Sequence, residues 1–453
     1  MRALHPLLVG SMLVLAVFAS GCPTPGDCTP GASIACTCTD GRSGAQICQP
    51  DQTLGVCSCT SSTDAGLDGS MVSDAAPDEG GLELIDAPDA SPPDAGTDAA
   101  TADPCIRDVD WLLQIDSSGS MSQEQGTLAA ELPAIVRALA TGDIDGDGTA
   151  EIDPIRSLHL GVSTPDLGTA EALAPSCSPY GDDGILRNAS SGDFGCPPDA
   201  FPSRVFAFTP ATDDVDAFAM DIACVARTGT RGCGFEQQLE AALKTLSPAA
   251  PTDWVSGTFV PPTFHGGTTG HGAAANDGFL REGSLLAITI VTDEDDCSAA
   301  DYGIFTPSDP RFMGVNLNLR CSTYDAALHP LARYVDGLLQ LREDPRLLVF
   351  GVIGGVPQDL VGVDSIARYD AILADPRMTN TPDPGSTPPN RLVPSCSSAA
   401  SGEAFPARRL VETARELLEA GARARVGSIC ASSYRSDLSA MVRAISAGAP
   451  SCE

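Results

Sequence analysis

Short apolar runs alternate with segments of helical periodicity from residue 109 almost to the end of this 453-residue chain. Five apolar runs predict buried strands, at 109–115, 157–164, 285–293, 347–355 and 426–432. Five segments with apolar residues at helical spacing predict helices, at 121–140, 235–246, 327–341, 408–421 and 436–448. Because alternating strands and helices build a sheet with both faces covered, we expect an α/β domain with a doubly wound, mostly parallel sheet over 105–453.

The ends of two of these helices carry recognisable cap residues. Gly421 is expected to end the helix of 408–421, and Ser436 to cap the start of the last helix. Two stretches rich in Pro, Gly and Cys, about 165–210 and 356–405, interrupt the alternation. Loops of that length are uncommon in compact domains unless they serve a function, so we expect disulfide-braced insertions.

The chain has 17 cysteines, which argues against a reducing compartment. One lies at position 22, six lie within 28–59 and ten lie within 105–453. The odd total then resolves into one modified thiol and two even sets, enough for eight disulfides. Spacing does not determine the pairing. Cys396–Cys430 is one predicted pair, and Cys105–Cys452 is another because the ends of a domain often lie close together.

Residues 1–22 have the pattern of a secretory signal, with Arg2, an apolar run over 7–18 and small residues after it. The apolar run is too short for a permanent membrane span. The segment Ala19-Ser20-Gly21-Cys22 resembles a bacterial lipobox, which implies that Cys22 is acylated and anchors the protein in the bacterial cell envelope. We therefore expect an outer-membrane lipoprotein that faces the cell surface or the periplasm. The alternative is an ordinary signal peptide with a coincidental cysteine.

Two segments separate this leader from the large domain. Residues 23–59 are too few for a hydrophobic core, so their six cysteines predict a small cystine module, with a zinc cluster as the alternative. Residues 60–104 contain eleven acids, no basic residue and few large apolar groups. Such a segment cannot offset its chain entropy by burial, so we expect a disordered acidic linker.

The chain carries a formal net charge of −34. An acidic field of that size repels phosphate backbones, so nucleic acid is not an expected partner. An acidic surface concentrates divalent cations, or it simply keeps a protein soluble, and charge alone does not separate these two interpretations.

A group of hard oxygen ligands follows two of the predicted strands. The sequence Asp116-Ser117-Ser118-Gly119-Ser120 comes directly after the first strand, and Thr292-Asp293 ends a later one. Carboxylate and hydroxyl oxygens are the ligands that Mg²⁺ prefers. Ligands of open α/β sheets bind outside the carboxyl ends of the strands, so we expect both loops at one rim.

These residues resemble the metal-ion-dependent adhesion site of the von Willebrand factor A family, across about residues 105–450. The resemblance implies a Rossmann-like fold and a site for Mg²⁺ or Mn²⁺. It also implies that Asp116, Ser118 and Ser120 are direct or nearly direct ligands, and that Asp293 acts through water.

The family adds a threonine from a loop before the third helix, which corresponds here to residues 228–234. Thr230 is the candidate, although a simple overlay puts Cys233 at the usual position. A disulfide from Cys233 to Cys224 would alter this loop.

In that family a partner's carboxylate often completes the coordination of the ion. We therefore expect adhesion to a protein or glycan that offers a carboxylate, and no enzymatic activity. Two alternatives stay open: a structural envelope protein with a vestigial site, and a metal-dependent hydrolase that uses Asp116, Asp293 and Asp296. The sequence contains no Gly-x-Ser-x-Gly, HExxH or phosphate-loop motif that would favour catalysis.

Two further acidic runs are candidates for calcium. Asp143, Asp145 and Asp147 have the spacing of the start of a calcium loop, but Pro154 stands where an EF-hand has its glutamate. The choice is between a single Ca²⁺ and a solvated turn. The run 293–296 predicts either a second Ca²⁺ or a charged rim. His265 and His271 lie in a Gly-rich loop and are expected to be solvated.

Overall fold

The computed structural model describes residues 33–37, 43–47 and 108–448, except 173, 175, 176, 191–195, 198 and 400. The predictions about Cys22, the linker of 60–104 and the pair Cys105–Cys452 lie outside the described residues. Within the cysteine-rich module, two short strands form an antiparallel pair, β1 (Ser33–Thr37) and β2 (Ser43–Ile47). Among the described residues, no helix combines the length and the apolarity that crossing a membrane requires.

A six-stranded sheet forms the centre of the domain, in the order β10-β7-β6-β3-β4-β5. Every neighbouring pair is parallel except β4 and β5, so the prediction of a mostly parallel α/β sheet is confirmed. The edge strand β5 was not predicted, because three residues are too short to show a period. The strands are β3 (Asp108–Ile115), β4 (Ser157–Ser163), β5 (Phe206–Phe208), β6 (Leu285–Val291), β7 (Leu348–Gly354) and β10 (Arg423–Ser428).

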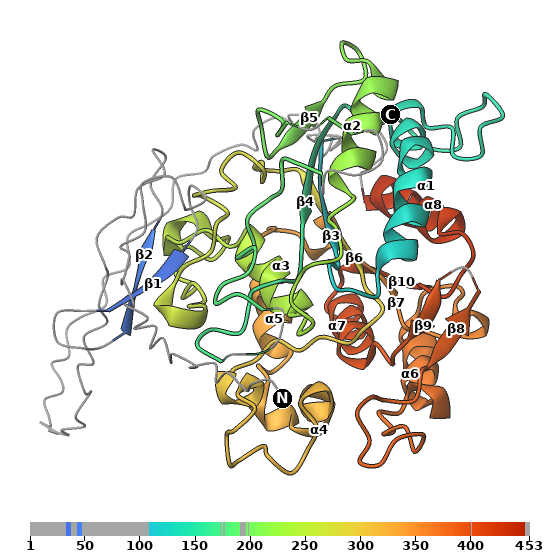
Figure 1. Cartoon of the computed structure of the whole chain (residues 1–453). Coiled ribbons are helices and arrows are strands. Elements are labelled where there is room, and N and C mark those ends of the chain that lie inside the picture. Colours follow the sequence, from blue (N-terminus) through green and yellow to red (C-terminus); the bar gives the residue numbers. More distant parts are fainter. Residues whose placement is uncertain are drawn as a thin grey trace, which may run out of the picture.

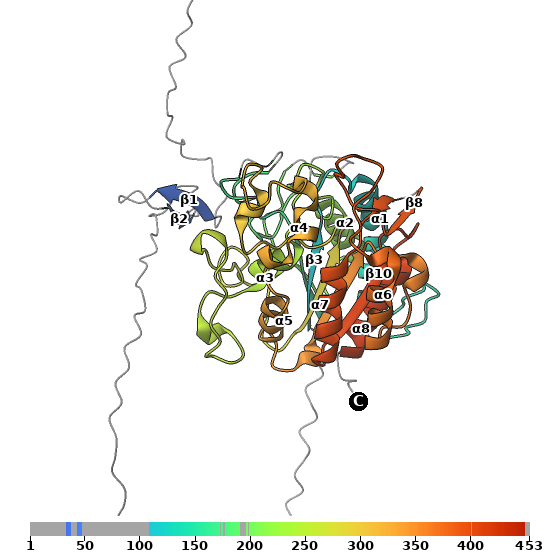
Figure 2. The same ribbon diagram turned by 90° about the horizontal axis from the view of Figure 1, so that it is seen from below.

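Helices cover both faces of this sheet, and alternate residues of β3 point to opposite layers (Figures 1 and 2). Trp111 packs in one core layer, while Leu112 packs in the other. The first layer contains α1 (Ser122–Thr141), α2 (Val215–Val225) and α8 (Arg435–Gly448). The second contains α3 (Gln238–Leu246), α5 (Ala332–Leu339), α6 (Ile366–Ala374) and α7 (Arg408–Glu419).

Several predicted boundaries shift in the structure. The helix expected over 327–341 begins only at Ala332, because a short turn precedes it. The last helix begins at Arg435, so the prediction of Ser436 as its cap is wrong. Ser433 lies at that end instead and accepts a hydrogen bond from the Arg435 amide at 3.2 Å. Gly421 has a φ of 97° and lies one residue beyond the C-cap of α7, where the left-handed conformation ends the helix.

Four disulfides lie among the described residues, and three of them tie the long stretches to the sheet domain, as expected for braced insertions. They are Cys177–Cys233, Cys196–Cys224, Cys297–Cys321 and Cys396–Cys430. The pair Cys396–Cys430 is confirmed. The pair Cys224–Cys233 is wrong, because the stretch of 165–210 passes beside both of these cysteines and supplies each with its partner. The second stretch carries its own small hairpin, β8 (Cys396–Ser398) and β9 (Gly402–Ala404), besides α6.

A buried polar cluster anchors the first stretch to α3. Lys244, the only lysine of the chain, donates to Asp183 at 2.5 Å and to Thr268 at 2.9 Å. His271 lies 2.9 Å from the other oxygen of Asp183 and is 2% exposed. The expectation that His271 is solvated is therefore wrong, since its loop folds back over α3.

Candidate metal centre

The sheet brings the two oxygen-rich loops together because their strands are neighbours. Ile115 and Val291 are register partners at the carboxyl ends of β3 and β6. The amide of Asp116 donates to the carbonyl of Val291 at 3.0 Å. Beyond the strands, the Thr292 hydroxyl donates to the Asp116 carboxylate at 2.7 Å, so the loops contact each other at one rim.

The first loop folds around the carboxylate of Asp116. The other oxygen of that carboxylate accepts from the amide of Ser118 at 2.7 Å. The hydroxyls of Ser118 and Ser120 lie 3.1 Å apart, and Ser120 also hydrogen-bonds the carboxylate of Asp293. We refer to Asp116, Ser118, Ser120 and Asp293 as the rim site. Its two carboxylates and two hydroxyls are hard oxygen donors, the set that suits Mg²⁺ or Mn²⁺.

A third loop approaches the rim site and is held there by Gln125 of α1, which sequence patterns did not single out. The Gln125 amide donates to the carbonyls of Asp116, at 2.7 Å, and Gly229, at 2.8 Å. Thr228 is buried, with its hydroxyl 3.5 Å from the carbonyl of Asp116. Thr230 is exposed and does not line the cavity beside the rim site. The structure therefore does not bring the tentative fifth ligand to the other four.

Gly232 fits this third loop closely against the first. Its amide donates to the carbonyl of Ser117 at 2.8 Å, and a Cβ at this position would lie 2.2 Å from the Ser117 hydroxyl oxygen. We expect Gly232→Ala to push the loops apart, to destabilise the fold by about 1–3 kcal/mol and to weaken divalent-cation binding. Thermal melts with and without Mn²⁺ measure both effects. Gly234→Ala is the matched control, because no atom lies within 4 Å of its Cβ position. Equal Mn²⁺ binding by both variants would contradict the prediction.

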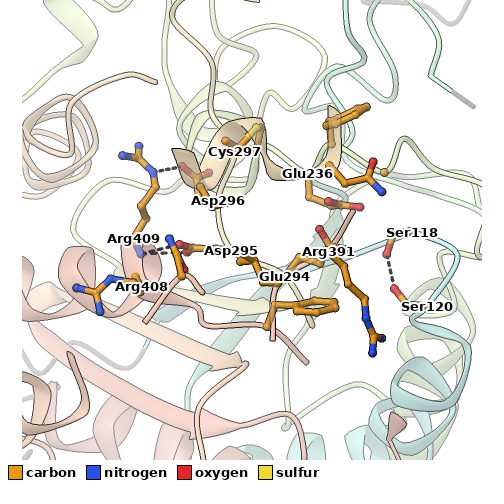
Figure 3. Close-up of a pocket in the computed structure, with 18 of the residues that line it drawn as sticks. Ser118, Ser120, Glu236, Glu294, Asp295, Asp296, Cys297, Arg391, Arg408 and Arg409 are labelled. Carbon is orange, nitrogen blue, oxygen red and sulfur yellow. Dashed lines mark hydrogen bonds and ion pairs between the residues drawn. A yellow bond between two sulfur atoms is a disulfide. The ribbon is translucent and has the colours of Figure 1, made fainter. Parts of the chain in front are cut away.

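Beside the rim site a cavity of about 800 Å³ opens, and Glu236 and Glu294 are among the residues that line it (Figure 3). Glu236 precedes α3 and is only 2% exposed, and its Oε1 has no hydrogen-bond partner among the described residues. Its carboxyl group lies close enough to that of Glu294, which follows Asp293, for each to affect the pKa of the other. We call Glu236 and Glu294 the glutamate pair. It adds two carboxylates to a site that the sequence motifs had defined with two.

The carboxyl groups at this rim have raised pKa values. Burial, the charge of Asp116 and that of Glu294 together raise the pKa of Asp293 to about 8. Burial and the charge of Asp116 raise the pKa of Glu294 to about 7, and burial holds the pKa of Glu236 well above its usual range. The charges that act most strongly on these groups are all negative. A buried set of this kind takes up protons or binds cations, because isolated buried charges are costly.

A second buried carboxylate, that of Asp110 on β3, differs from Asp116 because it is paired with arginines. Asp110 is fully buried near the amino end of the strand. It lies 2.7 Å from the guanidinium of Arg281 and 3.2 Å from that of Arg342. No Arg or Lys within the described ranges forms a salt bridge with Asp116, at the other end of the same strand. Unlike Asp110, Asp116 therefore has hydrogen-bond donors beside it but no counter-charge among the described residues.

The last two acids of the run 293–296 have partners within the protein. Asp295 accepts from the amide of Arg409 at 3.0 Å, at the start of α7. Asp296 accepts from the amide of Leu239 at 2.9 Å and from the guanidinium of Arg409 at 3.0 Å. These bonds fix α3 and α7 beside the rim site. The run therefore divides into two residues that face the site and two that hold its supporting helices.

The surface loop of Asp143, Asp145 and Asp147 gathers its carboxylates as its spacing suggested. Together with Glu151 these residues each place one oxygen within 4.8 Å of the others. Backbone amides of Gly146 and Gly148 donate to Asp143 at 2.6 and 2.8 Å. The cluster could bind a metal ion, and it is exposed, in contrast to the rim site.

The structure thus joins the four residues of the rim site, adds the glutamate pair and leaves Thr230 outside. Compared with known proteins, the chain matches no protein-family model and no curated protein sequence. Its function is therefore inferred from its donor atoms, their burial and their charge.

Proposed function

We propose that the rim site holds a divalent cation, Mg²⁺ or Mn²⁺, and that the protein uses the bound ion to hold a partner protein or glycan. The main support is that the carboxylates of Asp116, Asp293 and the glutamate pair lie together beside two serine hydroxyls. No basic side chain of the described residues forms a salt bridge with these carboxylates. The bound ion would supply a Lewis-acidic centre for oxygen atoms of the partner. Glu236, which lies between the loop of residues 228–234 and α3, would be a further ligand.

Two observations favour binding over hydrolysis. Asp296, a residue of the hydrolase alternative, is held by the amide of Leu239 and by Arg409. The cavity lining contains no histidine within the part of the chain that the structure describes. A vestigial site is also disfavoured, because carboxylates at 0% and 1% exposure, Asp116 and Asp293, cost stability when ionised without a counter-charge.

The proposal also covers the location of the domain in the cell. Acylation at Cys22 and the acidic linker of 60–104 would place the domain away from a bacterial membrane, as an envelope lipoprotein that binds at the cell surface or in the periplasm. The exposed loop of Asp143, Asp145 and Asp147 would bind one Ca²⁺ as a local brace. Its ion would lie outside the cavity, so it would take no part in holding the partner.

A calorimetric titration of Mn²⁺ into the full chain tests the cation site. The three loop aspartates, Asp143, Asp145 and Asp147, are changed to Asn so that the surface loop binds no cation. We expect affinity to fall by about tenfold per pH unit for each proton displaced as the pH drops from 8 to 5, because cation ligands must be deprotonated. The pKa values of Asp293, about 8, and Glu294, about 7, set this window.

The ion-free protein should show the opposite trend. A carboxyl group with a raised pKa binds protons in the folded state that the unfolded chain has lost, so the ion-free fold loses stability as the pH rises from about 4 to 8. The rise in melting temperature on adding Mn²⁺ should therefore be larger at pH 8 than at pH 5. No heat of binding at either pH, or an affinity independent of pH, would contradict the proposed site.

A further inference from the structure

The charge around the rim site restricts which partner group can approach the ion, and this inference rests on the proposed function. Asp116, Asp293 and the glutamate pair carry four negative charges when ionised. One divalent ion compensates only two of them. A partner carboxylate would bring a third uncompensated negative charge into a buried site, where like charges repel strongly.

The cavity also contains hydrogen-bond acceptors that lack donors. Glu236 Oε1 and Asn380 Oδ1 are buried and have no partner among the described residues. Both residues line the cavity. A carboxylate can only accept hydrogen bonds, so it would leave these two atoms unsatisfied. A hydroxyl group donates one hydrogen bond while its oxygen lone pairs stay available to a metal ion.

The shape of the cavity suits a chain of hydroxyl-bearing units. Ser118 and Ser120 lie on one side of it, and Arg408 and Arg409 lie on the other (Figure 3). Its walls come from the segment around α4 (Arg320–Thr323) and from the loop after α6, which lie at the same end of the molecule in Figure 1. Phe405 adds an apolar surface that can face the carbon atoms of a sugar ring. A volume of about 800 Å³ is large enough for a short oligosaccharide.

We infer that the partner is a neutral, hydroxyl-rich saccharide, whose oxygens complete the coordination of the ion and whose hydroxyls donate to Glu236 and Asn380. This replaces the carboxylate that the family resemblance implied. A basic peptide would also bring donors, but an ammonium group cannot coordinate a cation and would compete with it for the same carboxylates. A neutral sugar satisfies the ion and the acceptors together.

The full chain, with the surface loop silenced as above, is tested on an array of neutral oligosaccharides and uronic-acid oligosaccharides of equal length. We expect Mn²⁺-dependent retention of neutral members, at least about tenfold tighter than that of acidic ones, and its loss in EDTA. Calorimetry with Mn²⁺ alone runs in parallel. If Mn²⁺ does not bind, the proposed function fails together with the inference. If Mn²⁺ binds but acidic glycans are preferred, or no glycan is retained, only the inference is overturned. Binding of an oligolysine peptide that Mn²⁺ abolishes would also overturn it.

Two variants refine this test. Asn380→Leu removes one acceptor and should weaken saccharide binding by about tenfold while leaving Mn²⁺ affinity unchanged. Asn390→Leu is the matched control, because Asn390 lies in the same loop but does not line the cavity. Glu236→Gln removes one negative charge, so the preference should move toward the uronic-acid members. Equal saccharide affinity of Asn380→Leu and Asn390→Leu, or a move of Glu236→Gln toward neutral members, would contradict the inferred contacts.

Discussion

The Asp116→Asn protein should fold and should melt at least as high as the ion-free wild-type chain. Its melting temperature should not rise when Mn²⁺ or Mg²⁺ is added. Asparagine keeps the size of the side chain and an oxygen that can accept from the Ser118 amide, a bond of 2.7 Å in the structure. It removes a charge whose burial raises the pKa of Asp116. The wild-type chain should instead gain roughly 2.7 kcal/mol at an ion concentration 100 times the Kd.

Thermal melts across a series of ion concentrations measure this difference. Asp277→Asn is the matched control, because Asp277 is exposed and lies outside the cavity lining. The control should respond to Mn²⁺ as the wild-type chain does. If Asp116→Asn responded equally, the ion would bind elsewhere. If it melted far below the ion-free wild type, Asp116 would hold the fold rather than an ion.

Asp110→Asn should have the opposite profile, with a loss of about 3–5 kcal/mol in the free energy of unfolding. Its carboxylate compensates Arg342, whose burial already lowers the pKa of that guanidinium to about 10. Without Asp110 the buried charge of Arg342 keeps hydrogen bonds to Leu341 and Ser284 but has no negative partner among the described residues. Mn²⁺ affinity should stay unchanged, because Asp110 lies at the other end of β3 from the rim site.

Denaturant unfolding measures this loss, and two variants control it. Asp370→Asn breaks an exposed pair with Arg415 and should change stability by at most about 1 kcal/mol. Adding Arg342→Met to Asp110→Asn should restore part of the stability, because the unpaired charge is then absent. A loss below about 1 kcal/mol for Asp110→Asn would show that the two guanidinium contacts contribute little.

The sequence predicted the central layers because their signals are local. β6 and β7 are buried at every residue and mostly apolar, and amphipathic helices follow the strands, so the sequence predicted the order of the elements. The helix α2 was missed although Asp214 caps it and apolar residues follow at helical spacing. The helix α6 begins after Ser365 inside a stretch whose Pro and Gly content suggested only a loop. Composition averaged over 356–405 hid the short periodic segment of α6.

The rim site was predictable to the extent that it follows from topology. Asp116 and Asp293 end neighbouring strands, and parallel strands bring such ends to one edge. Glu236 was missed because the periodicity extended the helix back to 235, where a glutamate belongs to a solvated face. The helix begins instead at Gln238, and the turn before it points Glu236 into the cavity. The start of this helix was predicted about one turn too early, and Glu236 was therefore not recognised as a residue of the cavity.

The partners of the cysteines and of His271 depend on contacts between distant segments. Cys233 pairs with Cys177 across 56 residues, and His271 meets Asp183 across 88. Neither contact leaves a periodic pattern or a motif in the sequence, because packing determines the path of an irregular insertion. Of the predicted pairs that the described residues test, Cys396–Cys430 is correct and Cys224–Cys233 is not.

The position of Lys244 has a practical consequence. The chain offers one lysine side chain to any reagent, and in the folded domain this side chain is 3% exposed and its ammonium group is bonded to Asp183. Amine-coupling surfaces and lysine-specific proteases therefore meet no accessible lysine on the native domain. Acylation or cleavage at this position would mark only molecules in which the insertion has come away from α3, which makes the residue a built-in reporter of local opening.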